Sequence, residues 1–110
     1  MNTAYIIKGL RTAVGKSKRG GFRFTSPVDF GAEVINALLE ALPQLDPALV
    51  DDLIVGNAVP EAEQGLQMSR WLALRSKLPM SVPGVTVNRY CGSGIETIAM
   101  ATAKIQAGMA

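Results

Sequence analysis

Residues 84–94 read GVTVNRYCGSG, and within this stretch the sequence changes from a strand pattern to a helix pattern. Its first half, Gly84 to Asn88, follows Pro83 and is rich in β-branched residues, which predicts a short strand. From Gly92 onward the chain is rich in alanine, and its isoleucines have helical spacing, which predicts a largely buried helix ending near Gly108. The single cysteine, Cys91, lies at the junction.

The same alternation of strand and helix extends toward the N-terminus. Ala4–Gly9 and Leu53–Gly56 are short apolar runs that end in glycine, which predicts two further strands. Helices are expected from Ser26 to Pro43 and from about Gln64 to Lys77. Between the first strand and the first helix lies a basic, glycine-rich loop, residues 11–24.

The first helix has a clear start signal in its sequence. Ser26 can cap it, Pro27 suits the first helical position, and Asp29 is placed where a carboxylate can reach back to the cap. Four residues repeat at helical spacing and are expected to form a buried stripe: Phe30, Val34, Leu38 and Ala41.

The predicted order is therefore β-α-β-α-β-α, which indicates an α/β fold with a mostly parallel sheet and helices on its faces. The 110 residues are enough for one compact unit and not for two domains. The pattern stops at Ala110, where another strand would be expected to begin. We therefore expect residues 1–110 to be a single unit that forms the first part of a larger, apparently truncated domain.

Composition excludes several classes of protein. Hydrophobic residues make up 48% of the chain, which argues against general disorder, and the net charge of +2 gives no strong footprint for nucleic acid. One cysteine and no histidine exclude a disulfide scaffold and any imidazole chemistry from within the chain. No apolar run approaches the about 20 residues of a membrane span, and no signal peptide is evident, so a cytoplasmic protein is expected.

Two glycine motifs are only weak indications of nucleotide or phosphate binding. Residues 9–17 end in Gly15-Lys16-Ser17, but the glycine spacing differs by one residue from a phosphate-binding loop and no helix start follows. Gly92 and Gly94 match the first two glycines of a dinucleotide fingerprint, yet Thr97 stands where the third belongs. We interpret the first segment as a solvated basic loop after the first strand and do not interpret the second as a dinucleotide site.

Cys91 is a candidate nucleophile for three physical reasons. Helix N-terminal amides favour the thiolate, the small residues Gly92 and Gly94 allow close approach, and a sharp strand-to-helix turn holds a side chain out toward a pocket. The alternative is a small buried hydrophobic cysteine without chemistry. Position alone does not separate the two.

The stretch from Val87 to Gly94 closely resembles the acyl-enzyme signature of thiolases, with Asn88, Cys91, Ser93 and Gly94 at the matching spacing. Further segments are similar to that family in the same order over essentially the whole chain: residues 11–16, 51–57, 63–67 and 81–88. The last two resemble degradative 3-ketoacyl-CoA thiolases more than biosynthetic acetoacetyl-CoA thiolases. The resemblance implies a partial thiolase-fold N-terminal domain.

The resemblance also implies a function. Cys91 would accept the acyl group of a 3-ketoacyl-CoA with release of acetyl-CoA, its own amide would help hold the thioester oxygen, and a second CoA would take the acyl group. The other motif residues would shape the turn. Coenzyme A enters as a substrate, and no metal or redox cofactor is implied. Expected partners are acyl-CoA, CoA, the remainder of a thiolase chain and further copies in a dimer or tetramer.

The chain departs from the family pattern in one respect. Thiolases use a histidine and a second cysteine from their C-terminal half, and neither occurs here. The expectation is a nucleophile-bearing fragment of an acetyl-CoA acyltransferase that is inactive alone. The alternatives are a biosynthetic acetoacetyl-CoA thiolase and a non-catalytic packing or interaction module with the same fold. A ketoacyl synthase shares the fold and a cysteine nucleophile, but the spacing around Cys91 favours thiolase.

Overall fold

A computed structural model describes the whole chain, from Met1 to Ala110. Its framework consists of α1 (Pro27–Glu40), β1 (Leu53–Gly56), α2 (Met68–Arg75), β2 (Gly84–Val87) and α3 (Ser93–Gln106). Two short 3-10 helices, η1 (Pro47–Leu49) and η2 (Ala62–Gln64), lie in the connections on either side of β1. The strands pair in parallel, with Leu53 opposite Gly84 and Gly56 opposite Val87. The predicted α/β class is confirmed.

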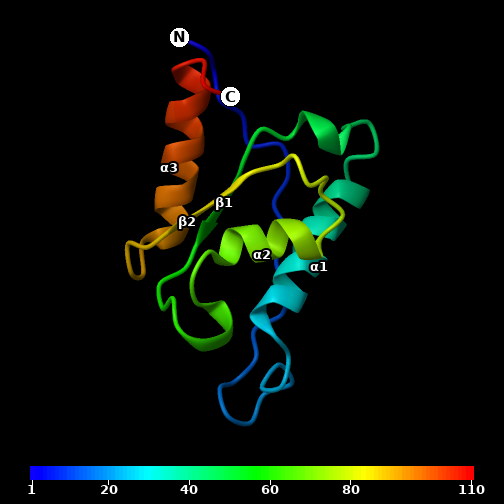
Figure 1. The fold of residues 1–110 in the computed structure, drawn as a ribbon, viewed down its shortest axis with the longest axis vertical. Coiled ribbons are helices and arrows are strands. Elements are labelled where there is room, and N and C mark those ends of the chain that lie inside the picture. The colour runs from blue at the N-terminus through cyan, green and yellow to red at the C-terminus, as the bar shows by residue number, and fades with distance from the viewer.

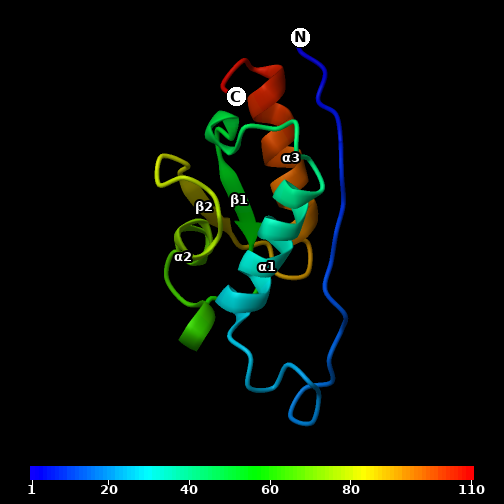
Figure 2. The same cartoon turned by 90° about the vertical axis from the view of Figure 1, so that its right-hand side faces the viewer.

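The two strands lie between helices (Figures 1 and 2). Helix α3 packs mainly on β1, α2 packs on both strands, and α1 packs against α2 rather than on the sheet. Figure 2 shows α2 and α3 on opposite sides of the strands. The chain therefore builds a three-layer arrangement around a narrow sheet. None of the helices is both long and apolar enough to cross a bilayer.

The core is centred on α2. Its apolar members that are shielded from solvent are Ala32, Met68, Leu72, Ala73, Leu78 and Val82. Ser69 is completely buried; its hydroxyl donates to the carbonyl of Leu53 (2.6 Å), and its N–H donates to Oγ1 of Thr86 (3.0 Å). A Cβ on Gly84 would lie 2.5 Å from the Ser69 hydroxyl, so the glycine is what lets α2 approach β2 this closely. One small polar residue thus ties α2 to both strands.

The predicted start of α1 is confirmed, with one difference. The Ser26 hydroxyl accepts a hydrogen bond from the N–H of Val28 (3.3 Å), and Pro27 is the first helical residue. Asp29 does not reach back to the cap. Its carboxylate instead accepts from Nε of Arg75 at 2.9 Å, because α2 packs alongside and offers a charged partner.

The predicted buried stripe of α1 is only partly formed. Phe30, Val34 and Leu38 are half-buried, Ala41 is exposed, and the one fully buried residue of the helix is Ala32. The reason is that α1 has α2 as its main neighbour, and α2 covers only part of the apolar stripe.

A second ion pair joins α1 to the end of α2. Nζ of Lys77 lies 2.8 Å from Oε1 of Glu40, and both side chains are well exposed. Two effects of Lys77 lower the pKa of Glu40: its hydrogen bond is the larger, and its positive charge is the smaller. The same contact raises the pKa of Lys77. Because both groups are in solvent, this pair orients the two helices more than it stabilises them.

The strand expected at Ala4–Gly9 does not form in this structure. The segment runs as an extended chain beside the packed elements (Figure 2), and Tyr5, Ile6 and Ile7 are 78%, 83% and 77% exposed. A nearby hydrogen bond to the body comes from before this segment, where the Asn2 side-chain amide donates to the carbonyl of Ile105 (3.2 Å). A β-branched run supplies strand propensity, but a strand also requires a neighbour to pair with, and no neighbour accepts these residues.

The helix predicted from about Gln64 to Lys77 is shorter than expected. Its α-helical part is limited to the eight residues of α2; Gln64 belongs to η2, and Leu66 between η2 and α2 has a positive φ of 55°. A left-handed residue cannot continue an α-helix, so the chain turns there before α2 begins.

The prediction that the last helix is largely buried is wrong for this chain. Only Ser93 of α3 is buried, whereas Ile95 and Ile98 are 74% and 51% exposed. One face of α3 rests on β1, and no other element covers the remaining faces. The helix does end as predicted, with Ala107 as its cap and Gly108 at a φ of 71°.

The isolated 110-residue polypeptide is expected to self-associate. It exposes 7781 Å², whereas a compact monomer of its 11.6 kDa exposes about 5,800 Å². Large apolar side chains are exposed on α3 and in the N-terminal segment, and the two-stranded sheet has unpaired edges, both of which favour association. Sedimentation velocity over a concentration series should show oligomers. A monomer with a single cooperative melting transition would contradict this expectation.

Candidate active site

Cys91 lies in the turn that connects β2 to α3. Its side chain is exposed, and α3 begins two residues later at Ser93. The alternative of a cysteine enclosed in the apolar core therefore does not apply to this structure. The thiol is accessible, and it lies at the carboxyl end of a strand and just before the N-terminal end of a helix.

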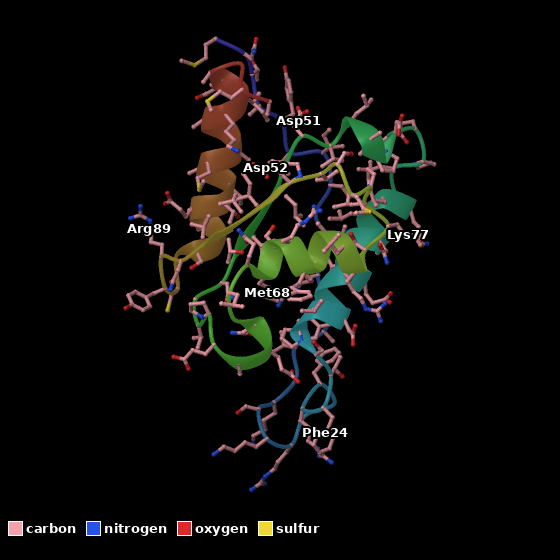
Figure 3. The ribbon with its side chains drawn as sticks, viewed as in Figure 1. Phe24, Asp51, Asp52, Met68, Lys77 and Arg89 are labelled. Atoms are coloured by element: carbon pink, nitrogen blue, oxygen red, sulfur yellow. The ribbon has the colours of Figure 1, made fainter.

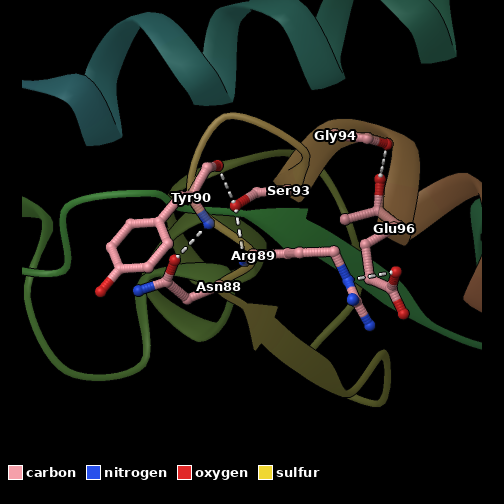
Figure 4. A network of polar contacts seen from close by, with 7 residues as sticks. Asn88, Arg89, Tyr90, Ser93, Gly94 and Glu96 are labelled. Carbon is pink, nitrogen blue, oxygen red and sulfur yellow. Dashed lines mark hydrogen bonds and ion pairs between the residues drawn. The ribbon is translucent and has the colours of Figure 1, made fainter.

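Two polar side chains build the turn, as Figure 4 shows. Oδ1 of Asn88 accepts from the N–H of Tyr90 (2.9 Å), and Oγ of Ser93 accepts from the N–H of Arg89 (2.9 Å). The Ser93 hydroxyl also donates to the carbonyl of Tyr90 (2.7 Å) and is itself buried. These contacts hold the backbone on both sides of Cys91 through two short side chains.

The backbone of the turn is unusual at Tyr90. This residue has a φ of 45°, in the left-handed region that most side chains avoid. It is held there by two hydrogen bonds: its N–H donates to Oδ1 of Asn88, and its carbonyl accepts from the Ser93 hydroxyl. A residue in this conformation reverses the chain direction sharply, which separates the Cys91 side chain from the strand before it.

The start of α3 offers hydrogen-bond donors beside Cys91. The helix is preceded by Gly92, which has no side chain to cap it. The main-chain N–H groups of Cys91, Gly94 and Ile95 donate no hydrogen bond within the chain. Unpaired amides at a helix N-terminus carry partial positive charge and attract an anionic oxygen or sulfur.

A close contact between β1 and α3 positions this helix start. A Cβ on Gly56 would lie 2.8 Å from the carbonyl carbon of Ser93 and 3.0 Å from the nitrogen of Gly94. Real Cβ atoms do not approach backbone atoms so closely, so the glycine allows α3 to begin directly against the end of β1. Glycine at position 56 was predicted as the end of a strand, but its role under the helix was not.

Asn57 is a buried residue whose role the sequence analysis missed. Its side-chain amide donates to the carbonyl of Gln64 (2.6 Å), and its side-chain oxygen accepts from the N–H of Val59 (3.3 Å). Its own N–H donates to the carbonyl of Val87 (2.9 Å) at the end of β2. Asn57 directly follows the apolar strand residues and Gly56, and a polar residue at that position could have indicated a role in shaping the loop. Asn57 fixes the loop that follows β1 beside the Cys91 turn.

A charged pair flanks the turn on the solvent side. Nε of Arg89 lies 2.7 Å from Oε2 of Glu96, one turn into α3, and the arginine side chain is 68% exposed. Figure 4 shows the pair reaching across from the turn to the helix. A pair this exposed contributes little to stability, but it adds a second link between the turn and α3.

A groove lies elsewhere in the molecule. It has a volume of about 720 Å³ and lies between α1, β1 and α3, where apolar side chains and Lys104, paired with Asp52, line it. Cys91 is not among its lining residues. We interpret this groove as uncovered packing surface. No three His, Cys, Asp or Glu side chains lie close enough together to hold a metal ion.

The structure also shows where the two glycine motifs lie. Gly15-Lys16-Ser17 lies in an exposed loop, and turns rather than a helix follow it. Gly92 and Gly94 belong to the Cys91 turn and the first turn of α3. The placement of the first agrees with its interpretation as a solvated basic loop.

The sequence of the chain matches a known protein family. The profile described as "Thiolase, N-terminal domain" matches residues 4–110. The chain belongs to the thiolase family. This confirms the family resemblance carried by residues 87–94, and the structure is consistent with part of a thiolase N-terminal domain.

Curated relatives of this thiolase chain carry a more specific name. A protein of Bacillus subtilis (strain 168) named 3-ketoacyl-CoA thiolase is 45% identical over 108 residues, which cover 98% of this chain and 27% of the relative. A protein of the same name from Saccharophagus degradans is 41% identical over 104 residues, covering 94% of this chain and 27% of the relative. The thiolase chain thus spans about a quarter of the length of these relatives.

Proposed function

We propose that this chain is the nucleophile-bearing part of a 3-ketoacyl-CoA thiolase, in which Cys91 carries the acyl group between two CoA molecules. The observation that carries the proposal is the exposed Cys91 side chain at the β2–α3 turn, next to unpaired helix N-terminal amides. Membership of the thiolase family and relatives named 3-ketoacyl-CoA thiolase support this substrate class over acetoacetyl-CoA synthesis.

The first half-reaction forms the acyl-enzyme. The Cys91 sulfur bonds, as the thiolate, to the C3 carbonyl carbon of the 3-ketoacyl-CoA. The C2–C3 bond then breaks, its electron pair remains on C2, and C2 takes up a proton. Acetyl-CoA leaves, and the shortened acyl group remains on Cys91 as a thioester.

The second half-reaction regenerates the enzyme. The thiolate sulfur of a new CoA attacks the thioester carbonyl carbon, the bond from that carbon to the Cys91 sulfur breaks, and a shortened acyl-CoA leaves. In both half-reactions the carbonyl oxygen becomes negatively charged. The free N–H groups at Cys91, Gly94 and Ile95 are suitable donors for such an oxygen, because they are fixed in place before the reaction begins.

Proton transfer requires groups that these 110 residues do not contain. The chain has no histidine and a single cysteine, so the base that deprotonates Cys91 and the donor that protonates C2 must come from other residues of the complete enzyme. The proposal therefore assigns this segment the nucleophile and its turn, and it assigns no independent turnover to it.

Covalent trapping tests the proposal directly. The complete protein would be exposed briefly to a 3-ketoacyl-CoA without free CoA, quenched in acid, digested and analysed by mass spectrometry. We expect the acyl mass on the peptide that contains Cys91, and its loss after CoA is added. The Cys91→Ala variant should show no acyl mass. An acyl group on any other residue of the wild-type enzyme would refute the assignment.

A further inference from the structure

The charges of this chain are unevenly distributed along the sequence. Residues 1–28 contain six Lys or Arg and no Asp or Glu, which is a formal charge of +6. Residues 29–110 contain five Lys or Arg and nine Asp or Glu, which is a formal charge of −4. The small net charge of the whole chain therefore hides a strongly basic N-terminal quarter.

The basic side chains of the two parts also differ in their partners. Beyond residue 28 four of the five form ion pairs, and the fifth, Arg70, donates to the carbonyls of Val82 and Met80. The six in the N-terminal part are all exposed, and none forms an ion pair: Lys8, Arg11, Lys16, Lys18, Arg19 and Arg23. Their charge is uncompensated within the chain.

Four of these six lie on one projecting loop with a defined shape. The loop extends from the body at the end opposite the two termini, and Figure 3 labels Phe24 within it. The N–H of Gly20 donates to the carbonyl of Lys16 (2.6 Å), and a Cβ on Gly20 would meet that oxygen at 2.2 Å. The Phe22 ring packs 5.6 Å from that of Phe30, which anchors the loop to α1. The basic side chains are therefore presented by a folded turn.

An aromatic ring accompanies the charges. Phe24 is 89% exposed, and the guanidinium of Arg23 lies over its ring at 4.8 Å from the centroid. A cationic loop with an exposed ring suits a ligand that combines phosphates with a flat base, because the phosphates pair with Lys and Arg and the base stacks on the ring.

We propose that the loop Lys16–Phe24 attracts the phosphate- and adenine-bearing end of CoA substrates and speeds their association with the enzyme. The inference rests on the proposed function, which makes CoA thioesters the substrates. A concentrated positive potential without compensating acids raises the association rate of polyanions, and the gain falls as salt screens it. The loop acts on association, so it affects kcat/KM and leaves kcat unchanged.

The test compares two double variants of the complete protein that remove the same charge. Lys16→Gln with Arg19→Gln removes two unpaired charges from the loop, and Arg75→Gln with Lys77→Gln removes two charges that are paired with Asp29 and Glu40. Each enzyme is assayed with a 3-ketoacyl-CoA and with the N-acetylcysteamine thioester of the same acid, which has no phosphate or adenine. The assays run from low to high ionic strength.

At an ionic strength of about 0.01 M we expect the loop variant to lose about three- to tenfold in kcat/KM for the CoA thioester, with kcat unchanged. The loss should disappear at high salt and with the N-acetylcysteamine thioester, and the control variant should not show it. An equal loss with both thioesters, an equal loss in the control variant, or no loss would overturn the inference. A wild-type enzyme without activity on either thioester would refute the proposed function instead.

Discussion

Replacing Cys91 with alanine is expected to lower kcat for thiolytic cleavage by the complete enzyme by at least about 10³-fold, since the covalent route has no other nucleophile in this segment. The side chain is exposed and makes no packing contact that the core requires, so the melting temperature should stay close to that of the wild type. Steady-state kinetics together with thermal melting check both parts.

Cys91→Ser provides the matched variant for this experiment. Serine keeps the size of the side chain and the geometry of the turn, but its hydroxyl is a much weaker nucleophile at neutral pH than a thiolate. We expect it to fold like the wild type and to retain little activity. Substantial turnover by either variant would show that the acyl group does not pass through this residue.

Substituting Gly56 by alanine is expected to destabilise the enzyme by about 1–3 kcal/mol and to slow acylation of Cys91. The new Cβ would be 2.8 Å from the carbonyl carbon of Ser93 and 2.9 Å from its oxygen, and neither backbone atom can move without displacing the start of α3. The same displacement would shift the amides beside Cys91. Denaturant unfolding measures the first effect, and single-turnover acylation measures the second.

Gly94→Ala is the control for the stability measurement. Gly94 belongs to the first turn of the same helix, but a Cβ there would meet nothing within 4 Å. Alanine is a better helix former than glycine, so this variant should be as stable as the wild type or slightly more stable. Equal destabilisation by the two substitutions would contradict the explanation from close contact at Gly56.

The sequence predicted the candidate site well where its geometry depends on neighbouring residues. The strand before Cys91, the helix after it and the turn between them follow from local pattern, because strand propensity and helix spacing act over a few residues. The exposure of Cys91 was left open by its position and came from the structure. The left-handed conformation of Tyr90 and the buried contacts of Asn57 did not follow. The Tyr90 conformation is held by short-range hydrogen bonds to Asn88 and Ser93, which strand and helix propensities do not encode. The bond from the N–H of Asn57 to the carbonyl of Val87 forms only when the two strands pair.

Some expectations failed because propensity does not supply a partner. Ala4–Gly9 has the composition of a strand, yet no edge accepts it, so Ile6 and Ile7 remain in solvent. Helix α3 has the composition of a buried helix, yet one face alone is covered. Local rules predicted that Asp29 would contact the cap of α1, but its carboxylate instead forms an ion pair with Arg75 of α2.

By itself, the amino-acid sequence determined the start of α1 at Ser26, the strand Leu53–Gly56 and the single thiol at position 91. Each depends on short-range sterics and hydrogen bonding, which a few consecutive residues settle. Only the tertiary structure decided that Gly56 lies against Ser93 and that the basic side chains of the loop have no acidic partner within the chain. Those facts depend on which distant segments come into contact, and contact between distant segments is set by packing rather than by local preference.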